Sequence, residues 1–190
     1  KQAAAMARRL SHLPLKALYS SPVTRCMETA GHLSRLLDLD IQQLDDIGEV
    51  RYGEWEGAEI ETLAKEKSWY AVQHFPSRFR FPQGEALREV QARAVSALET
   101  LAANHEKSEL IAVVSHADLI KLVLAHYLGV HIDLFQRIVI SPASVSVLAL
   151  MENGMVRVLR VNDDGPLQAP KPEEEQEEKT TEHANGKRDA

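Results

Sequence analysis

Arg25 stands at a place in the sequence where an arginine can bind an anion. It follows Ser20-Ser21-Pro22, which ends the short apolar run of residues 15–19, and helical spacing of apolar residues begins directly after it. A guanidinium group can donate to two phosphate oxygens at once, and the N-terminus of a helix adds a positive dipole end. The pattern therefore allows a phosphate site at Arg25. The alternative is that the serines only cap a helix and Arg25 is an ordinary surface side chain.

His116 is the second candidate for chemistry. It lies between the apolar, β-branched run Leu110–Val114 and a helical pattern over residues 119–128. The run is typical of a central strand that is covered on both faces, and ligands bind at the carboxyl ends of such strands. We expect His116 to donate hydrogen bonds to a phosphate and, as a cation, to stabilise charge on a transferring phosphoryl group. Asp118 is expected only to favour the helix dipole.

Glu49 is the third candidate, in the polar, glycine-containing segment of residues 48–57. A carboxyl group there could donate a proton to a leaving group, and nearby anions would raise its pKa. Taken alone, the segment is better explained as a plain polar loop with two glycines.

The apolar periodicity predicts the elements that position these residues. Strands are predicted at residues 15–19, 41–44, 110–114, 135–140, 144–150 and 156–161, the last two joined by a hairpin turn at 152–154. Helices are predicted near residues 3–13, 27–37, 59–67, 85–104 and 119–128, with an irregular excursion at 69–82. This alternation predicts an α/β fold, a three-layer α/β/α sandwich with a mostly parallel central sheet.

Composition and charge divide the chain into two parts. The 190 residues can form one substantial core, which we place in residues 1–162. Residues 163–190 hold 9 of the 28 acids and 4 of the 22 bases, with almost no apolar residues. Such a segment cannot offset its ordering entropy by burial, so we predict a disordered acidic tail. A solvated tail is favoured over a docking peptide.

The same numbers exclude several classes of protein. The net charge of −6 argues against a nucleic-acid partner. No apolar run reaches the 18 to 20 residues or so that a membrane span needs, and no signal peptide pattern is visible. We therefore expect a cytoplasmic protein without a membrane partner. Its oligomeric state is left open.

The single cysteine and the remaining histidines carry weaker hypotheses. Cys26 can form neither an internal disulfide nor a thiolate metal site, and a buried, inert thiol is favoured over a reactive one. A metal site of His126, His131 and Asp133 is disfavoured, because the spacing fits no common site and Gly129 breaks the helix between the histidines.

Taken together, four ordered blocks resemble the histidine phosphatase superfamily, the phosphoglycerate-mutase-like fold. The blocks are Ser20-Ser21-Pro22-x-x-Arg25, Glu49-x-x-x-Gly53-x-Trp55-Glu56-Gly57, Gly84-Glu85 followed by Arg93, and Ser115-His116-Ala117. The resemblance covers nearly all of residues 1–162. Residues 81–85, 133–137 and 142–147 resemble in particular a compact bacterial branch whose members are labelled phosphomutases.

The resemblance implies a mechanism through a phosphohistidine, without metal or cofactor, on a small phosphorylated metabolite. Arg25 would bind phosphate, and Glu49 would be the acid or acid-base group. His116 would flank the phosphoryl group as the second histidine, and Ala117 would offer its backbone N–H at the helix terminus. These roles agree with what phosphoryl transfer needs, which is positioning and positive donors.

One departure from the family pattern is serious. The Arg-His-Gly signature at the end of the family's first strand, which carries the nucleophile, is absent, and His12 falls in a helix after that strand. The chain also opens at Lys1 inside a helical pattern. We therefore expect an N-terminal truncation that removes the first strand, and a chain that is inactive as it stands.

Two functions remain in competition. The first is a phosphotransferase that, when complete, hydrolyses phosphomonoesters or, less favoured, moves a phosphate within a molecule. The short excursion between residues 58 and 82 predicts an open pocket that admits water, which favours a phosphatase over a mutase. The second is a non-catalytic module that binds a phosphorylated ligand.

Overall fold

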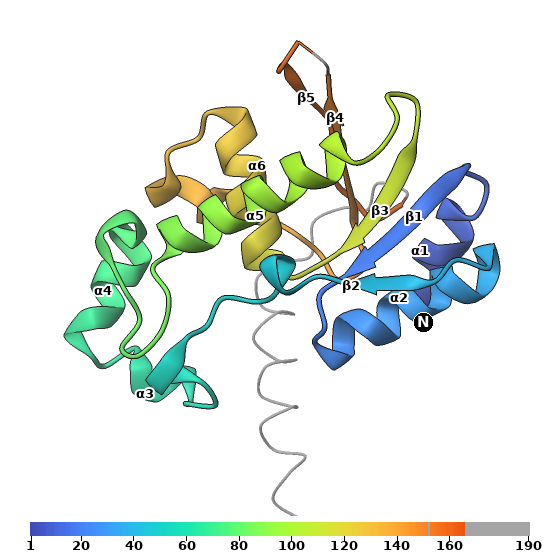
Figure 1. Cartoon of the computed structure of the whole chain (residues 1–190). Coiled ribbons are helices and arrows are strands. Elements are labelled where there is room, and N and C mark those ends of the chain that lie inside the picture. The colour runs from blue at the N-terminus through green and yellow to red at the C-terminus, as the bar shows by residue number, and fades with distance from the viewer. Residues whose placement is uncertain (152, 166–190) are drawn as a thin grey trace, which may run out of the picture.

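The computed structural model describes residues 1–151 and 153–165 (Figure 1). Its central feature is a parallel sheet of three strands in the order β2–β1–β3. These strands are β1 (Leu15–Ser20), β2 (Ile41–Gln43) and β3 (Leu110–Val114). A second, antiparallel sheet pairs β4 (Val145–Leu150) with β5 (Val156–Asp163). The structure therefore has two separate sheets where the sequence predicts one.

Helices lie on both sides of the parallel sheet (Figure 1). The α-helices are α1 (Gln2–Leu10), α2 (Thr24–Leu37), α3 (Ile60–Leu63), α4 (Lys67–His74), α5 (Leu87–Ala103) and α6 (Ala117–Leu128). The short 3₁₀ helices are η1 (Asp45–Ile47), η2 (Gly53–Trp55), η3 (Pro76–Arg78) and η4 (Ile132–Arg137). The predicted α/β sandwich is confirmed.

Each of the two helical layers has its own apolar cluster. On one side, Ala7 of α1 and Ala30 and Leu33 of α2 pack against Leu18 of β1. On the other side, α5 and α6 form the larger cluster, which includes Val90, Leu122 and Phe135 and extends under the loops before α5. Helix α6 is apolar nearly all round and is therefore buried. It ends at Gly129, whose left-handed backbone (φ 67°) supplies the C-cap.

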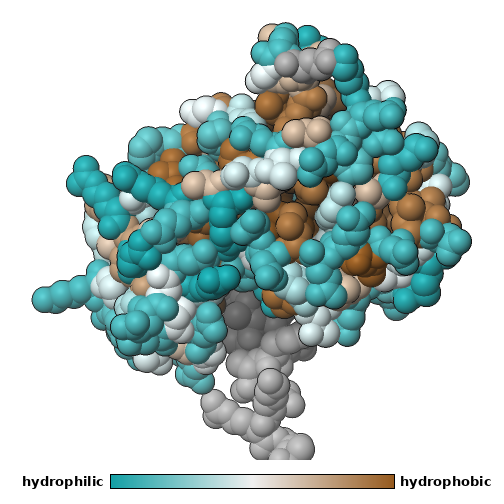
Figure 2. All heavy atoms as spheres, in the orientation of Figure 1, coloured by the Kyte–Doolittle hydropathy of each residue, from teal (hydrophilic) through white to brown (hydrophobic). Residues whose placement is uncertain are grey.

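The prediction that β3 is a central strand covered on both faces is wrong. Strand β3 is at the edge of its sheet and pairs only with β1 among the described residues. None of its five residues is buried, and none of the six residues of β4 is buried either, although both strands are almost entirely apolar. The reason is that the described residues provide no strand between β3 and the β4–β5 hairpin. Apolar surface on that hairpin is visible in Figure 2.

Most predicted elements are confirmed within a few residues, and two are wrong. Residues 67–74 form α4, where the sequence predicts an irregular excursion. The helix is short and has no fully buried residue, and only Trp69 and Val72 pack against the core, so its periodicity is too brief to detect. Residues 135–140 do not form a strand. The 3₁₀ helix η4 replaces it, because Ile132 and Phe135, three residues apart, enter the core together. The predicted helix at 59–67 shortens to α3.

Strand β5 extends to Asp163, one residue beyond the predicted boundary of the folded part, and Arg9 of α1 pairs with the Asp163 carboxylate. Residue 152 of the predicted hairpin turn and most of the predicted tail, residues 166–190, lie outside the described residues. Within the described part of the chain, no helix is long and apolar enough to cross a membrane.

Candidate active site

The parallel pairing of β1 with β3 brings two distant segments of the sequence together. Ser20 of β1 is in register with Val114 of β3, and the Ser21 N–H donates to the Val114 carbonyl at 2.9 Å. The residues that follow the two strands therefore meet at the carboxyl edge of the sheet, where the sequence predicts the site.

His116 occupies the innermost position of this site. It is the N-cap of α6, with extended backbone (φ −107°, ψ 153°), and its side chain is only 1% exposed. Its Nε2 atom lies 2.8 Å from the Ser21 hydroxyl, which is itself fully buried. The ring is therefore held in place by the hydroxyl of the residue that follows the neighbouring strand β1.

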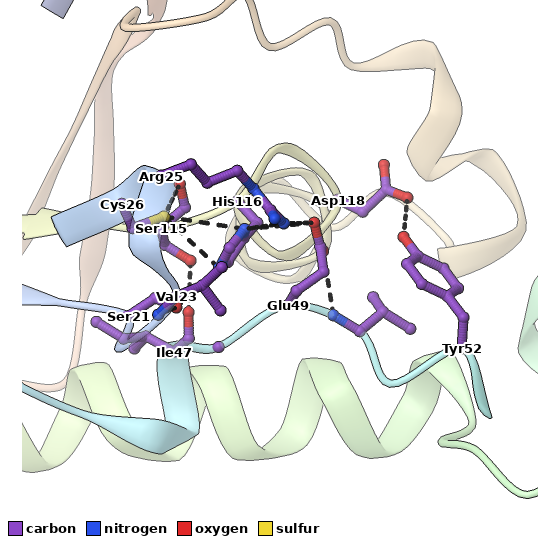
Figure 3. A network of polar contacts seen from close by, with 12 residues as sticks. Ser21, Val23, Arg25, Cys26, Ile47, Glu49, Tyr52, Ser115, His116 and Asp118 are labelled. Atoms are coloured by element: carbon purple, nitrogen blue, oxygen red, sulfur yellow. Dashed lines mark hydrogen bonds and ion pairs between the residues drawn. The ribbon is translucent and has the colours of Figure 1, made fainter. Parts of the chain in front are cut away.

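Arg25 and Glu49 converge on the other nitrogen of the same ring (Figure 3). The Arg25 Nη2 atom lies 2.8 Å from His116 Nδ1 and donates to Glu49 Oε2 at 3.0 Å. Glu49 Oε2 is also 3.3 Å from His116 Nδ1. The Arg25 side chain is 61% exposed, so it reaches over the buried histidine from the solvent side. The structure thus brings together all three side chains that the sequence singles out.

The surroundings of His116 raise its pKa. Burial by itself lowers the pKa, but hydrogen bonds to Cys26 and Glu49 and the charge of Glu49 outweigh it and raise the pKa to about 9. The Arg25 contact works against this, because a guanidinium donor at 2.8 Å favours a neutral ring. The Arg25 N–H can donate only to an unprotonated Nδ1, whereas a protonated ring donates its Nδ1–H to Glu49 Oε2 at 3.3 Å. The two contacts therefore belong to two protonation states of His116, and the raised pKa favours the second.

The pKa of Glu49 is shifted in the direction opposite to the prediction. Partial burial raises it, but the hydrogen bond and charge of His116, the Val50 N–H and the charge of Arg25 together lower it. The expectation of a raised pKa assumes neighbouring anions, whereas in the structure the groups that face Glu49 are cations. Glu49 is therefore ionised at neutral pH in this state.

Ala117 is the first residue of α6, as the sequence predicts within two residues. The N–H groups in the first turn of a helix have no acceptor inside the helix, and they point outward with the positive end of the dipole. Because His116 caps this helix, its side chain and these amides lie at the same point of the fold.

Cys26 lies behind the site rather than in it. The side chain is buried, and its Sγ atom is 3.6 Å from His116 Nε2 and donates to the Ser115 carbonyl at 3.5 Å. The predicted buried thiol is confirmed, and it contacts the catalytic candidate His116, which the sequence does not reveal.

A cavity of about 510 Å³ opens above Arg25 and Glu49. Arg51, Tyr52 and Trp55 contribute to its wall, whereas His116 is not among the residues that line it and meets the cavity only through Arg25 and Glu49. Trp55 also packs against Phe81 and other aromatic rings behind the wall. The cavity is large enough for a small ligand.

Sequence reasoning missed several residues that support the site. The sequence indicates only a helix-capping role for Ser21, and it places Arg93 in a family motif without indicating a role. Asp118 accepts hydrogen bonds from Tyr52 at 3.2 Å and from Lys121 at 3.0 Å, so it does more than favour the helix dipole. No local signal identifies these partners, because each pairing depends on the tertiary fold.

His126, His131 and Asp133, the residues of the disfavoured metal site, make other contacts in the structure. Asp133 accepts from the Ser77 N–H at 2.8 Å and lies 3.4 Å from His131, while His126 stacks edge-on against Tyr127. In the part of the chain that the structure describes, no group of three or more His, Cys, Asp or Glu side chains could hold a metal ion.

Comparisons with known proteins place this geometry in context. Phosphoserine phosphatase 1 of Hydrogenobacter thermophilus is 29% identical over 167 residues, which cover 85% of this chain and 77% of the relative. The bifunctional protein Rv2228c of Mycobacterium tuberculosis is 28% identical over 154 residues, which cover 80% of this chain but only 42% of the longer relative.

Solved structures share the fold. YhfR of Bacillus stearothermophilus superposes with a TM-score of 0.80 at 24% identity, covering 85% of this chain and 81% of that one. Mycobacterial glucosyl-3-phosphoglycerate phosphatase Rv2419c in complex with VO3 gives 0.73 at 21% identity, covering 85% and 83%. A mutant phosphoserine phosphatase from Entamoeba histolytica in complex with phosphoserine gives 0.76 at 19% identity, covering 86% and 81%.

The family model that matches describes the histidine phosphatase superfamily, branch 1, and the match runs over residues 1–164. This range contains every described helix and strand and all the residues of the site. Because the match covers most of the chain, this chain belongs to the histidine phosphatase superfamily.

Proposed function

We propose that this chain is the phosphate-binding body of a phosphomonoester hydrolase that acts on a small phosphorylated metabolite. The observation that carries the proposal is that the Arg25 and His116 side chains meet beside the N-terminus of α6, with Arg25 Nη2 2.8 Å from His116 Nδ1. Two cationic donors and a helix dipole favour an anion with several oxygens, which is the geometry of a phosphoryl group.

Each residue has a role in this proposal. Arg25 and the first amides of α6, including that of Ala117, bind the phosphoryl oxygens, and His116 stabilises their charge in the transition state. When the substrate is bound, its phosphate charge beside Glu49 raises the pKa of that carboxyl group, which takes up a proton. Glu49 then gives this proton to the ester oxygen as the phosphoryl group moves to a nucleophilic histidine. Water then attacks the phosphohistidine and returns a proton to Glu49, so that alcohol and inorganic phosphate are the products.

The nucleophile must come from outside the described residues. None of the other described histidines contacts Arg25, Glu49 or His116. Among the described residues β3 is an edge strand, and the apolar residues of β3 and β4 are not buried, so a further strand can pair with the free edge of β3. We propose that such a strand completes the sheet and presents the nucleophile next to His116, and that residues 1–162 without it form an inactive remainder of the domain.

The open cavity and the named relatives favour hydrolysis over mutase activity. A cavity that opens to solvent admits water to the phosphohistidine. The relatives include a phosphatase named for phosphoserine and one named for glucosyl-3-phosphoglycerate, both small phosphate esters. We therefore propose a small phosphate ester as substrate.

Two measurements test the proposal. Vanadate or phosphate titrated into the 190-residue chain should perturb the His116 ring signals in NMR spectra, and Arg25→Ala should abolish the effect at the same concentrations. Arg35→Ala, which removes an exposed arginine of α2 far along the helix, is the control. Absence of binding by the folded wild-type chain would contradict the proposal.

The second measurement separates an enzyme from a binding module. The product of the complete gene, given a phosphate ester with a good leaving group, should form an acid-labile, alkali-stable phosphohistidine and release phosphate. Binding of vanadate without phosphohistidine would favour the alternative, a module that only binds a phosphorylated ligand. That alternative has one observation in its favour, the lack of a second histidine near His116 among the described residues.

A further inference from the structure

Arg93, in the middle of α5, uses all five of its N–H donors within the protein. Two of them bind the Glu85 carboxylate, each at 2.9 Å. The other three donate to backbone carbonyls of the segment 46–49. These bonds are 2.7 Å to Asp46, 3.0 Å to Gly48 and 3.0 Å to Glu49. The Arg93 side chain is only 18% exposed. This arginine therefore has no donor left for a ligand.

Glu85 extends the same contact to the other side of Glu49. Its Oε2 atom accepts from the Arg51 N–H at 3.0 Å, and its own N–H donates to the Arg51 carbonyl at 2.9 Å. Arg93 and Glu85 together hold the backbone immediately before and after Glu49. Between these contacts lies Val50, whose N–H donates to Glu49 Oε1 at 3.1 Å.

The turn that carries Glu85 fits tightly against the Glu49 segment. A side chain at Gly84 would place its Cβ 2.3 Å from the Arg51 carbonyl, and one at Gly53 would lie 2.1 Å from the Pro82 carbonyl. Gly53 also has a left-handed backbone (φ 58°). The two backbones can approach this closely only because both positions are glycine.

The Glu49 segment needs such support because it is not regular structure. Residues 48–52 belong to no helix or strand, so no ladder of hydrogen bonds sets their position. Beyond the Arg93–Glu85 pair, the segment is tied at its ends, where Ser115 Oγ donates to the Ile47 carbonyl at 2.7 Å and Tyr52 OH donates to Asp118 (Figure 3).

We propose that Arg93 and Glu85 are positioning residues for Glu49, which hold its backbone so that its carboxylate lies against Arg25 and His116. Neither residue touches the reacting atoms. The inference deepens the proposed function, because the value of a fixed Glu49 rests on its role as proton donor. The positioning of Glu49 by Arg93 and Glu85 does not depend on its role as proton donor, and it can be tested without measuring catalysis.

The test is the pKa of His116, followed by NMR through the ring signals of the 190-residue chain. Four groups contact the ring, namely Ser21, Arg25, Cys26 and Glu49, and Glu49 is the one whose position depends on Arg93. In Arg93→Gln the backbone on either side of Glu49 loses its support, so the Glu49 carboxylate is no longer held against His116. The pKa of His116 should then fall by about one pH unit, toward its value in Glu49→Gln. In the Arg93→Gln, Glu49→Gln double variant, the Arg93 change should have no further effect.

Two further variants complete the design. Glu85→Gln keeps the size of the side chain and should lower the His116 pKa in the same direction, and it serves if Arg93→Gln does not fold. Arg9→Gln, which breaks an arginine–aspartate pair between α1 and β5, is the matched control and should leave the His116 pKa unchanged.

Two results would overturn the inference. One is an unchanged His116 pKa in a folded Arg93→Gln or Glu85→Gln protein. The other is an equal change in the Glu49→Gln background, which would show that Arg93 acts on His116 by a route other than Glu49. Failure of vanadate binding with the expected pKa changes would contradict the proposed function and leave the positioning role intact.

Discussion

The two arginine–glutamate pairs near the site use the same chemistry for opposite purposes. Arg93 is 18% exposed, Glu85 is 15% exposed, and every guanidinium donor has a partner. Arg25 is 61% exposed, and among the described residues only its Nη2 atom makes hydrogen bonds. A saturated, buried guanidinium stabilises structure, whereas an exposed one with free donors can bind a ligand. Counting the used donors of an arginine thus separates the two roles better than its charge does.

Arg93→Ala is the strongest test of this contrast. Removing one partner of a mostly buried pair leaves the Glu85 carboxylate with only the Arg51 N–H as donor and three carbonyls with none, so the free energy of unfolding should fall by about 2–4 kcal/mol. Urea denaturation measures the loss. If Arg93→Ala were as stable as wild type, the pair would have no structural role and the contrast with Arg25 would disappear.

Arg25→Ala should show the reverse pattern. The free energy of unfolding should change little, because the side chain is mostly exposed. The dissociation constant for phosphate should rise about 10- to 150-fold, since charge-assisted hydrogen bonds contribute about 1.5–3 kcal/mol. Isothermal titration calorimetry provides the constant. Arg51→Ala, which removes another arginine from the same cavity, is the control and should have the smaller effect.

The charge of His116 links the site to stability through pH. Its pKa in the folded protein is about 9, above the ordinary value of 6.5, so its contribution is fully present below pH 6.5. As the pH rises from 6.5 through 9, the unfolded chain loses this proton first, and the contribution is lost. Arg25 offsets part of the effect because it lies 2.8 Å from the ring.

The measurement compares wild type with His116→Asn in urea denaturation between pH 6 and pH 10. The stability difference between them should shrink across this range. A difference that stays constant would indicate that the pKa of His116 is not raised, and would favour the neutral ring that accepts from Arg25.

Glu49→Gln is expected to have the smallest effect on binding, and with the opposite sign to Arg25→Ala. The carboxylate competes with a phosphate for Arg25 and His116, so removing its charge should tighten phosphate binding about two- to fivefold. In an active phosphatase of the proposed kind, the same variant should slow the hydrolysis of esters with poor leaving groups. Weaker phosphate binding by Glu49→Gln would show that the carboxylate orients the cations instead.

Much of the fold could be predicted because it depends on local periodicity. The strands at residues 15–19 and 110–114 and the long helix near residues 85–104 match β1, β3 and α5 closely. Helix α4 could not be predicted, because it is only eight residues long and contacts the core only through the partly buried Trp69 and Val72. The predicted strand at 135–140 failed because a 3₁₀ turn buries Ile132 and Phe135 equally well.

The site shows the same division. Strand ends and helix starts identify Arg25 and His116 in the sequence, because the residues at the carboxyl edge of a sheet directly follow the strands along the chain. The direction of the Glu49 pKa could not be predicted, since it depends on which charges the fold brings against the carboxylate. Arg93 makes its contacts with backbone atoms 44 to 47 residues away, and no local pattern encodes them.

The sequence by itself determined the order of strands and helices, the α/β class and the three side chains of the anion site, because periodicity and the residues at strand ends are local properties. Only the tertiary structure decided that β3 is an edge strand, that Glu49 faces two cations, and that Arg93 supports the site rather than binding a ligand. Each of these depends on contacts between segments far apart in the chain, where burial and neighbouring charges, not residue type, determine what a side chain does.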